Sequence, residues 1–421
     1  MSIEGPIQTN VSGLVFNYDT ANSKSYVGEP TTNLNSQVSN YTGTGYSSDG
    51  EWTSDPTRFT KTYNSDLTTP IGKGATLCVE SGTAGYHHLS RMGGGNENGL
   101  HSISCYLYPL NVITNFTIGM LGDGGNQITF NLSTKAITYG GGIENRNAFC
   151  VDVPGYPGWL RVGANIEGRY GGWVGCVGIN TSSSYTPSAP YKGFYITGLQ
   201  YEYKSAPTAY TIGTRSNTQG LIDLTSNTTL DLTNVKFDSS SDIDFPINAS
   251  ANSYITTNTN CGLTGDQTLS AWIKPTYGTN SPHRTVICTD PSYQYGIKLM
   301  NYKNNARWGL WVGWGSSNYE AMTGTNINDN AWKMITGTWK QSTGVVTLYL
   351  NGVYVTQFNT GNTSAISLNT GNIRVGIGYE IDFGNGQSYE GKIGNAAIYN
   401  RTLTASEVLK NFNSLRSRYN V

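Results

Sequence analysis

The segment from Ala331 to Gly352 constrains the fold more than any other part of this 421-residue chain. Two runs, residues 331–339 and 345–350, are rich in Trp, Ile, Val, Thr and Tyr, and a short polar turn ending in Gly344 joins them. This composition and spacing is typical of a β-hairpin. Asn351-Gly352 predicts a second tight turn, because both residues tolerate the positive φ that a two-residue hairpin loop requires. Both faces of the first run carry apolar side chains, so we expect the pair to lie well inside a sheet.

Three blocks of the sequence are similar, in the same order, to the laminin G-like, concanavalin A-like family. The hairpin resembles the family's central strand pair, which ends in a Y-x-N-G pattern. Upstream, Leu269-Ser270-Ala271-Trp272-Ile273-Lys274-Pro275 resembles its S-x-W-hydrophobic-K-P strand. Downstream, residues 389–407 resemble its closing strand and short helix. Gly394 replaces an acidic residue common at that place, which argues against carrying over a calcium site.

The residues before these blocks indicate a second domain inserted into the first. Residues 13–26 resemble the first strand of laminin G-like domains in phage structural proteins, but the pattern resumes only near Gly220, and so long a gap holds a domain rather than a loop. Residues 158–163 and 193–211 resemble parts of carbohydrate-binding-module-like jelly rolls in tailed-phage proteins. Their Trp159, Gln200 and Glu202 are interpreted as framework, because strand-centre residues usually serve packing and satisfied hydrogen bonds.

We therefore expect an all-β protein built from two β-sandwich jelly rolls with one short C-terminal helix. Residues 1–33 would supply the first strand of the laminin G-like sandwich, residues 34–212 the inserted jelly roll, and residues 213–421 the rest of the laminin G-like sandwich. The helix is predicted by a capping-box pattern at Thr404 and Glu407. An apolar stripe follows at helical spacing, formed by Val408, Leu409, Phe412 and Leu415.

Bulk composition excludes several classes of partner. Charged residues are only 13% of the chain and the net charge is −1, so we expect neither nucleic acid nor an anionic membrane as a partner. The apolar runs are too short for a membrane span, and the first six residues do not resemble a secretory signal. Six widely spaced cysteines favour buried free thiols of a protein made in a reducing cytoplasm. Disulfides within residues 78–176 are the alternative.

One acidic string suggests catalysis, and its last residue argues against it. The string from Glu380 through Asp382 to Asn385 is similar to the E-x-D-x-x-E strand of concanavalin A-like glucanases. Retaining hydrolysis needs a nucleophile and an acid/base carboxylate about 5 Å apart, and the amide of Asn385 cannot act as the acid/base. We expect no catalytic residue. Glu380 and Asp382 are interpreted as polar contacts to a glycan or to a calcium ion, with plain loop residues as the alternative.

Metal binding by histidine is not expected. His87-His88 is the one histidine pair in the sequence, and adjacent residues of a strand point to opposite faces, so the two rings do not readily chelate one ion. Apart from the calcium ion considered above, the sequence predicts no cofactor.

Trp311 is the sharpest candidate for contact with a ligand. Period two along residues 307–315 places Trp308, Leu310, Val312 and Trp314 on one face, which we expect to be core, and Trp311 between two glycines on the other. Its ring would then be accessible for stacking on a sugar or a neighbouring subunit. The alternative is that a facing sheet or domain covers it. Trp173, which also stands among glycines and close to Tyr170, repeats the pattern in the inserted domain.

Taken together, the resemblances imply a virion structural or appendage protein of a tailed phage, assembled in the host cytoplasm, that displays glycan-binding folds for host-surface attachment. Its expected partners are other virion proteins, further copies of itself and a host-surface glycan. A charge-poor surface rich in Tyr and Asn suits neutral sugars or repeated protein contacts. A decoration protein that binds no sugar is the main alternative, and a glycoside hydrolase is the second.

Overall fold

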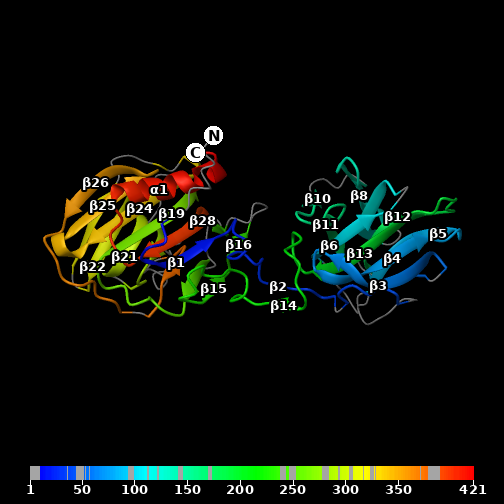
Figure 1. The fold of residues 1–421 in the computed structure, drawn as a ribbon, viewed down its shortest axis with the longest axis horizontal. Coiled ribbons are helices and arrows are strands. Elements are labelled where there is room, and N and C mark those ends of the chain that lie inside the picture. Colours follow the sequence, from blue (N-terminus) through cyan, green and yellow to red (C-terminus); the bar gives the residue numbers. More distant parts are fainter. Residues whose placement is uncertain are drawn as a thin grey trace. The chain divides into compact units, whose positions relative to one another are not determined.

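The computed structural model describes residues 10–421 apart from 36, 44–51, 53, 56, 93–98, 111–112, 121–122, 141–145, 169–172, 238–242, 246–252, 277–283, 293, 303–306, 316, 323–326, 328, 370 and 378–388. The chain forms two compact units (Figure 1). The first, here called the split unit, consists of Met1–Pro30 and Ser216–Val421, and the second, the middle unit, of Thr31–Arg215. Antiparallel sheets dominate both units, and the described part of the chain has one α-helix, close to its C-terminus, so the predicted all-β class is confirmed.

The split unit contains two antiparallel sheets. The first, the helix-covered sheet, has the strand order β16-β17-β28-β19-β24-β25-β26, and β1 pairs with β28 beside β17. Its strands are β1 (Leu14–Asp19), β16 (Lys236–Phe237), β17 (Ile243–Phe245), β19 (Gln267–Pro275), β24 (Lys333–Lys340), β25 (Val345–Leu350), β26 (Val353–Asn359) and β28 (Gly391–Tyr399). The second sheet has the order β15-β18-β27-β20-β21-β22-β23. Its strands are β15 (Leu230–Thr233), β18 (Tyr254–Thr257), β20 (Arg284–Cys288), β21 (Tyr295–Tyr302), β22 (Arg307–Trp314), β23 (Asn318–Met322) and β27 (Arg374–Val375).

The predicted hairpin lies inside the helix-covered sheet. The short 3-10 helix η1 (Gln341–Thr343) joins β24 to β25, and Gly344 follows it with a φ of 65°. Asn351 and Gly352 have φ values of 50° and 79°, so both adopt the left-handed conformation that the tight turn requires. Ile335 is buried between the two sheets, whereas Met334 is buried on the opposite face. The prediction of a strand buried on both faces is confirmed.

The N-terminal strand contributes directly to the core between these sheets. β1 runs antiparallel to β28, with Phe16 opposite Ile398 and Tyr18 opposite Ala396. Phe16 and Tyr18 are both 0% exposed and belong to the same core cluster as Trp308 and Leu310 of β22. The segment that opens the chain is therefore an integral part of a sandwich whose other strands begin after residue 216.

The C-terminal helix α1 (Ala405–Leu415) has the predicted capping box, in which the Thr404 hydroxyl accepts from the Glu407 backbone and the Glu407 carboxylate accepts from the Thr404 backbone. The 3-10 helix η3 (Arg416–Tyr419) follows it. Val408 and Phe412 are buried against the helix-covered sheet, whereas Leu409 is 43% exposed. Leu409 belongs to the predicted apolar stripe but lies at its exposed margin, against Gly352 in the turn between β25 and β26.

The middle unit also contains two antiparallel sheets, with the orders β10-β11-β6-β13-β4-β3 and β5-β12-β7-β8-β9. Phe194 of the first sheet meets Phe116 of the second at 5.4 Å between ring centroids, in an edge-to-face contact within the core. A short pair, β2 (Thr31–Thr32) with β14 (Thr214–Arg215), joins the two ends of the unit. The other strands are β3 (Phe59–Thr69), β4 (Gly72–Glu80), β5 (Gly85–Met92), β6 (Gly99–Pro109), β7 (Asn115–Met120), β8 (Asp123–Asn131), β9 (Ile137–Tyr139), β10 (Phe149–Asp152), β11 (Leu160–Gly168), β12 (Trp173–Tyr185) and β13 (Gly193–Glu202).

The cysteines whose side chains are described are free thiols, as predicted: Cys78, Cys105, Cys150, Cys261 and Cys288. Burial raises the pKa of Cys78 to about 12 and that of Cys288 to about 11. Because the thiolate is the reactive form, these buried thiols are structural. Among the described residues, no helix is both long and apolar enough to cross a bilayer.

Candidate functional site

A pocket of about 120 Å³ lies in the split unit, between the C-terminal helical segment, β1 and the outer face of the helix-covered sheet. Trp272 of β19 forms part of its wall. The indole stacks on the ring of Phe412 of α1, at 5.6 Å between ring centroids, and on the ring of Tyr419 of η3, at 4.3 Å. Met334, Ala397 and Leu415 complete the apolar part of the lining. We call this cavity the terminal pocket, because both ends of the chain build it.

The polar part of the lining carries amide side chains. Asn395 of β28 donates through Nδ2 to Asn17 Oδ1 at 3.0 Å and to the Tyr18 carbonyl at 2.8 Å. Asp19 also lines the pocket, but its carboxylate forms an ion pair with the Arg418 guanidinium. The lining therefore presents neutral hydrogen-bonding groups and a carboxylate that is already paired, which suits an uncharged ligand.

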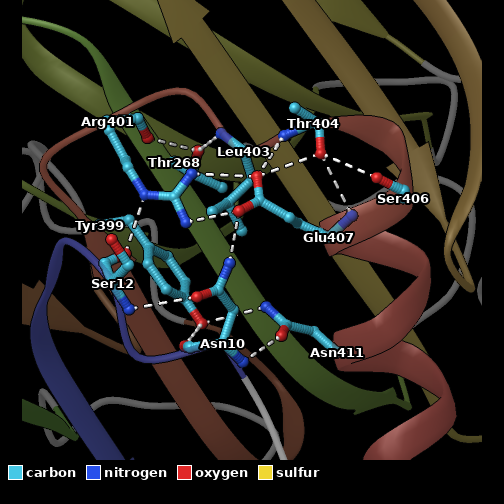
Figure 2. Close-up of polar contacts among 10 residues, drawn as sticks. All are labelled: Asn10, Ser12, Thr268, Tyr399, Arg401, Leu403, Thr404, Ser406, Glu407 and Asn411. Atoms are coloured by element: carbon cyan, nitrogen blue, oxygen red, sulfur yellow. Dashed lines mark hydrogen bonds and ion pairs between the residues drawn. The ribbon is translucent and has the colours of Figure 1, made fainter.

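A hydrogen-bonded network, the terminal clamp, fastens the helix over this pocket (Figure 2). Asn10 donates through its backbone to Asn411 Oδ1 at 2.8 Å and through Nδ2 to Glu407 Oε1 at 2.6 Å. Its carbonyl accepts from the Tyr399 hydroxyl at 3.0 Å, and that hydroxyl also accepts from Asn411 Nδ2. The Arg401 guanidinium donates two hydrogen bonds to the Glu407 carboxylate, at 2.7 and 2.9 Å. The clamp thus joins the N-terminal segment, β28 and α1.

The charge state of Glu407 makes the clamp sensitive to acid. Hydrogen bonds from Arg401, helped by those from Thr404, lower the pKa of the Glu407 carboxyl to about 2. A carboxyl whose pKa is depressed in the folded state contributes stability that is present above its unfolded pKa and is lost as the pH falls toward the folded pKa. The pair is about one quarter exposed, with 28% and 27% for the two side chains, so solvent screens part of this contribution.

We expect Glu407→Gln to lower the free energy of unfolding of the split unit by roughly 1–2 kcal/mol at pH 6 and by less near pH 3. At pH 3 the folded carboxylate is still charged, but the carboxyl of the unfolded chain is already protonated, so part of the stability that comes from the lowered folded pKa is lost. Urea denaturation at a series of pH values measures this difference. Asp231→Asn, which removes another carboxylate of the same unit, is the control and should give a smaller difference at pH 6. A Glu407→Gln effect that is independent of pH would contradict the charge-based role.

The structure corrects the expectation for Trp311. The predicted alternation is confirmed, since Trp308, Leu310 and Val312 face the core. However, Trp311 is only 7% exposed, so the prediction of an accessible stacking ring was wrong. Lys298, directly opposite Trp311 in the neighbouring strand β21, places its Nζ 4.1 Å from the centre of the ring. The indole therefore serves as a partner for a buried cation.

Lys298 is a buried lysine with a shifted pKa, a feature that often marks a functional site and that the sequence did not reveal. It is 3% exposed and donates through Nζ to the carbonyls of Ser292 at 2.9 Å and Tyr295 at 2.6 Å. Burial lowers its pKa to about 8. Its ammonium thus ties the segment between β20 and β21 to the Trp311 ring, which is a structural role.

The structure does not describe the side chains of the other predicted ligand contacts. Tyr170, Glu380 and Asp382, as well as Asn385, lie outside the described residues. Trp173 is the first residue of β12, and its side chain is likewise not described. Their roles in glycan or calcium binding stay predictions. Within the described residues, no three His, Cys, Asp or Glu side chains are grouped to hold a metal ion.

The side chains of His87 and His88 point to opposite faces of their strand, as expected for adjacent strand residues. His87 is 0% exposed and packs edge-to-face on Phe59 at 5.9 Å between ring centroids, whereas His88 contacts the partly exposed Tyr86. Burial, followed by the neighbouring His87, lowers the pKa of His88 to about 4. The two rings therefore belong to different environments and are neutral at physiological pH.

The predicted framework residues of the middle unit are confirmed. Glu202 is 0% exposed and accepts from the hydroxyls of Thr31 at 2.7 Å and Thr208 at 2.6 Å. It also accepts from the Thr208 backbone at 3.0 Å and from the Ser102 hydroxyl at 3.3 Å. Gln200 accepts from the Thr211 backbone at 2.7 Å. These two residues fasten the returning segment after β13 and are not available to a ligand.

Comparison with known proteins places the split unit in a fold class. Residues 249–409 match the family model described as the Concanavalin A-like lectin/glucanases superfamily. This part of the chain has a laminin G-like, concanavalin A-like fold, as the sequence blocks predicted. No curated protein matches the chain.

Several solved structures resemble part of the chain. One is the binding domain of Paraclostridial Mosquitocidal Protein 1, with 22% identity, a TM-score of 0.39, and coverage of 46% of this chain and 49% of that chain. Another is the binding domain of Botulinum neurotoxin serotype G, with 19% identity, a TM-score of 0.38, and coverage of 47% and 49%. A third is the binding domain of Botulinum neurotoxin DC in complex with rat synaptotagmin II. It has 16% identity and a TM-score of 0.39, and the match covers 48% of this chain and 50% of that chain. The chain spans about half the length of these structures.

Proposed function

We propose that this chain is a glycan-binding protein, carried on a phage virion as a structural or appendage protein for attachment to the host surface. The observation that carries the proposal is the terminal pocket, which lies in the unit that contains the match to the lectin and glucanase superfamily. Its lining combines aromatic rings with uncharged amide groups. That combination suits sugars, which offer an apolar ring face together with hydroxyls that donate and accept hydrogen bonds.

The binding is proposed to occur without hydrolysis, because Asn385 occupies the place where a glucanase-type acid/base carboxylate would be needed. We expect the full chain to be retained on immobilised polysaccharides of host type, and no reducing ends to appear in solution. A reducing-end assay beside the retention assay measures both. Release of reducing ends that disappears on Asp382→Asn would show that the chain is an enzyme, and retention on none of the polysaccharides would contradict the glycan proposal.

Decoration without sugar binding is the second candidate, and one surface favours it. β26 ends the helix-covered sheet and carries no charged residue, while Val353, Tyr354 and Phe358 are 64%, 53% and 42% exposed. Edge strands are usually protected by charges or proline, so an uncharged apolar edge suits contact with another copy or another virion protein. Imaging the virion with a labelled copy of this chain distinguishes glycan attachment from decoration. Attachment requires that the terminal pocket is exposed on the particle. Decoration requires that β26 lies inside an intersubunit contact.

A further inference from the structure

Strand β5 of the middle unit lies at the edge of its sheet, beside β12 (Figure 1). Among the described strands it pairs with β12 alone, and the register between the two strands shifts at three places. An edge strand with one irregular partner is the kind of element that opens locally without unfolding the rest of a domain. The strand contains both members of the histidine pair, so its detachment would carry both imidazole rings into water.

His87 occupies the core face of β5. Its side chain is 0% exposed and packs on Phe59, at 5.9 Å between ring centroids, and on Tyr185, at 4.8 Å. Neither Nδ1 nor Nε2 has a hydrogen-bond partner among the described residues. Aromatic packing accommodates the neutral ring. Protonation would place a positive charge and a second N–H donor in the same apolar surroundings, which is costly for a buried group.

His88 occupies the other face of β5 and is 7% exposed. Its Nδ1 is buried and has no hydrogen-bond partner among the described residues. Tyr86 is its aromatic neighbour, at 6.1 Å between ring centroids. Gly178 of β12 lies directly opposite His88, and a side chain at Gly178 would collide with the backbone of β5. The two strands therefore meet closely at the point where the second imidazole is buried.

The groups around His87 favour its neutral form. Burial lowers the pKa of His87, and the positive charges of Arg58 and Lys192 lower it further. The backbone carbonyls of Gly85 and Thr83 act in the opposite direction, but the pKa stays below its ordinary value. Charging this ring is therefore easier in an open strand than in the closed sheet.

The groups around His88 have the same effect. Burial, followed by His87, lowers the pKa of His88 to about 4, and Asp55 offsets only part of this shift. Because both pKa values are lowered in the closed state, the open state binds more protons, and the closed state loses stability as the pH falls from about 6.5 toward 4. Glu80, a buried carboxyl of the same unit, has a raised pKa, so its contribution favours the folded state as the pH falls and cannot drive opening.

We propose that β5 is an acid-released edge strand: protonation of His87 and His88 detaches it from β12 and opens this side of the middle unit. Leu89 follows the two histidines and is buried in the core, so the open state also exposes an apolar side chain. The response is confined to β5 and its partner strand, because both proton acceptors lie in β5. This device is independent of the proposed glycan-binding function, which is assigned to the other unit.

Hydrogen–deuterium exchange of the full chain, followed by mass spectrometry between pH 7.5 and pH 5, tests the proposal. Exchange is corrected for the pH dependence of the intrinsic rate, so that the remaining change reports the opening equilibrium. His88 alone should raise the opening of β5 about 30-fold over this range, and His87 should add to that factor. The interior strands β6 and β13 of the other sheet should change much less.

A double variant separates the two histidines from other effects of acid. His87→Phe keeps an aromatic ring against Phe59 and Tyr185, and His88→Gln keeps a polar side chain; together they remove both titrating groups. We expect this variant to lose the rise in β5 opening at pH 5. His101→Phe is the matched control, because it removes another buried histidine of the same unit, in the interior strand β6, and should leave the rise unchanged.

Three outcomes would overturn the proposal. The first is an opening of β5 that does not rise on acidification, and the second is a rise that persists in the double variant. The third is an equal loss of protection in β6 and β13, since the whole unit rather than one strand would then open. If the double variant does not fold, imidazole resonances of the wild-type chain decide in its place: a His88 ring that titrates near pH 6.5 in the folded protein removes the driving force and overturns the proposal, whereas a ring that stays neutral to about pH 4 supports it.

Discussion

Removal of residues 1–30 should unfold the split unit or lower its melting temperature by at least about 12 °C, while the middle unit keeps its own transition. Phe16 and Tyr18 are fully buried in the core of the split unit, and each buried aromatic side chain is worth about 3–5 kcal/mol. The loss of both is comparable to the whole stability of a domain, about 5–15 kcal/mol. The truncation also removes the backbone pairing of β1 with β28.

Differential scanning calorimetry of the full chain resolves the two transitions and measures the shift. Phe16→Ala is the corresponding point change and should lower only the transition of the split unit. Val11→Ala is the matched control, because Val11 is 72% exposed and should contribute almost nothing. If the truncated chain kept both transitions at their original temperatures, β1 would not be a required strand of the sandwich.

The elements that the sequence predicted well are those fixed by local chemistry. The hairpin of β24 and β25 and the turn at Asn351-Gly352 follow from strand composition and from positive φ at both turn residues. The capping box of α1 follows from the spacing of Thr404 and Glu407. An interrupted family pattern predicted that the N-terminal segment supplies a strand of the later sandwich, and the structure shows that this strand, β1, pairs with β28. For the hairpin, the turn and the capping box, a few neighbouring residues carry the whole signal.

The site depended on information that the sequence does not carry. Strand alternation correctly placed Trp311 on the face away from the core, but it could not show that Lys298 would cover the ring, because the register between β21 and β22 is set by tertiary pairing. The terminal pocket combines Asn17, Trp272, Asn395 and Asn411, which are far apart in the chain. Trp272 is recognisable in the sequence as a strand residue, but its stacking on Phe412 and Tyr419 becomes visible only once α1 and η3 are placed on the sheet.

A buried carboxylate without a cation among its described contacts should be the most sensitive single position of the middle unit. Glu202 accepts four hydrogen bonds, from Thr31, Ser102 and twice from Thr208. These donors lie in three separate segments, so the carboxylate links the start of the unit and its returning end to the C-terminal end of β13. Glu202→Ala would leave buried hydroxyl and backbone donors without acceptors, at about 1–3 kcal/mol each for those that cannot rearrange.

We therefore expect Glu202→Ala to destabilise the middle unit by about 4 kcal/mol and to lower its melting temperature by roughly 8–16 °C, with the split unit unchanged. Glu202→Gln should destabilise the middle unit less than Glu202→Ala, because the amide keeps one of the two oxygen acceptors. It should still destabilise the unit, because the new NH₂ group faces donors. Asp152→Asn is the control: the Asp152 side chain is 80% exposed in its pair with Lys135, and an exposed pair contributes at most about 1 kcal/mol. A Glu202→Ala shift no larger than that of Asp152→Asn would contradict the framework role, and would reopen the buried carboxylate as a functional group.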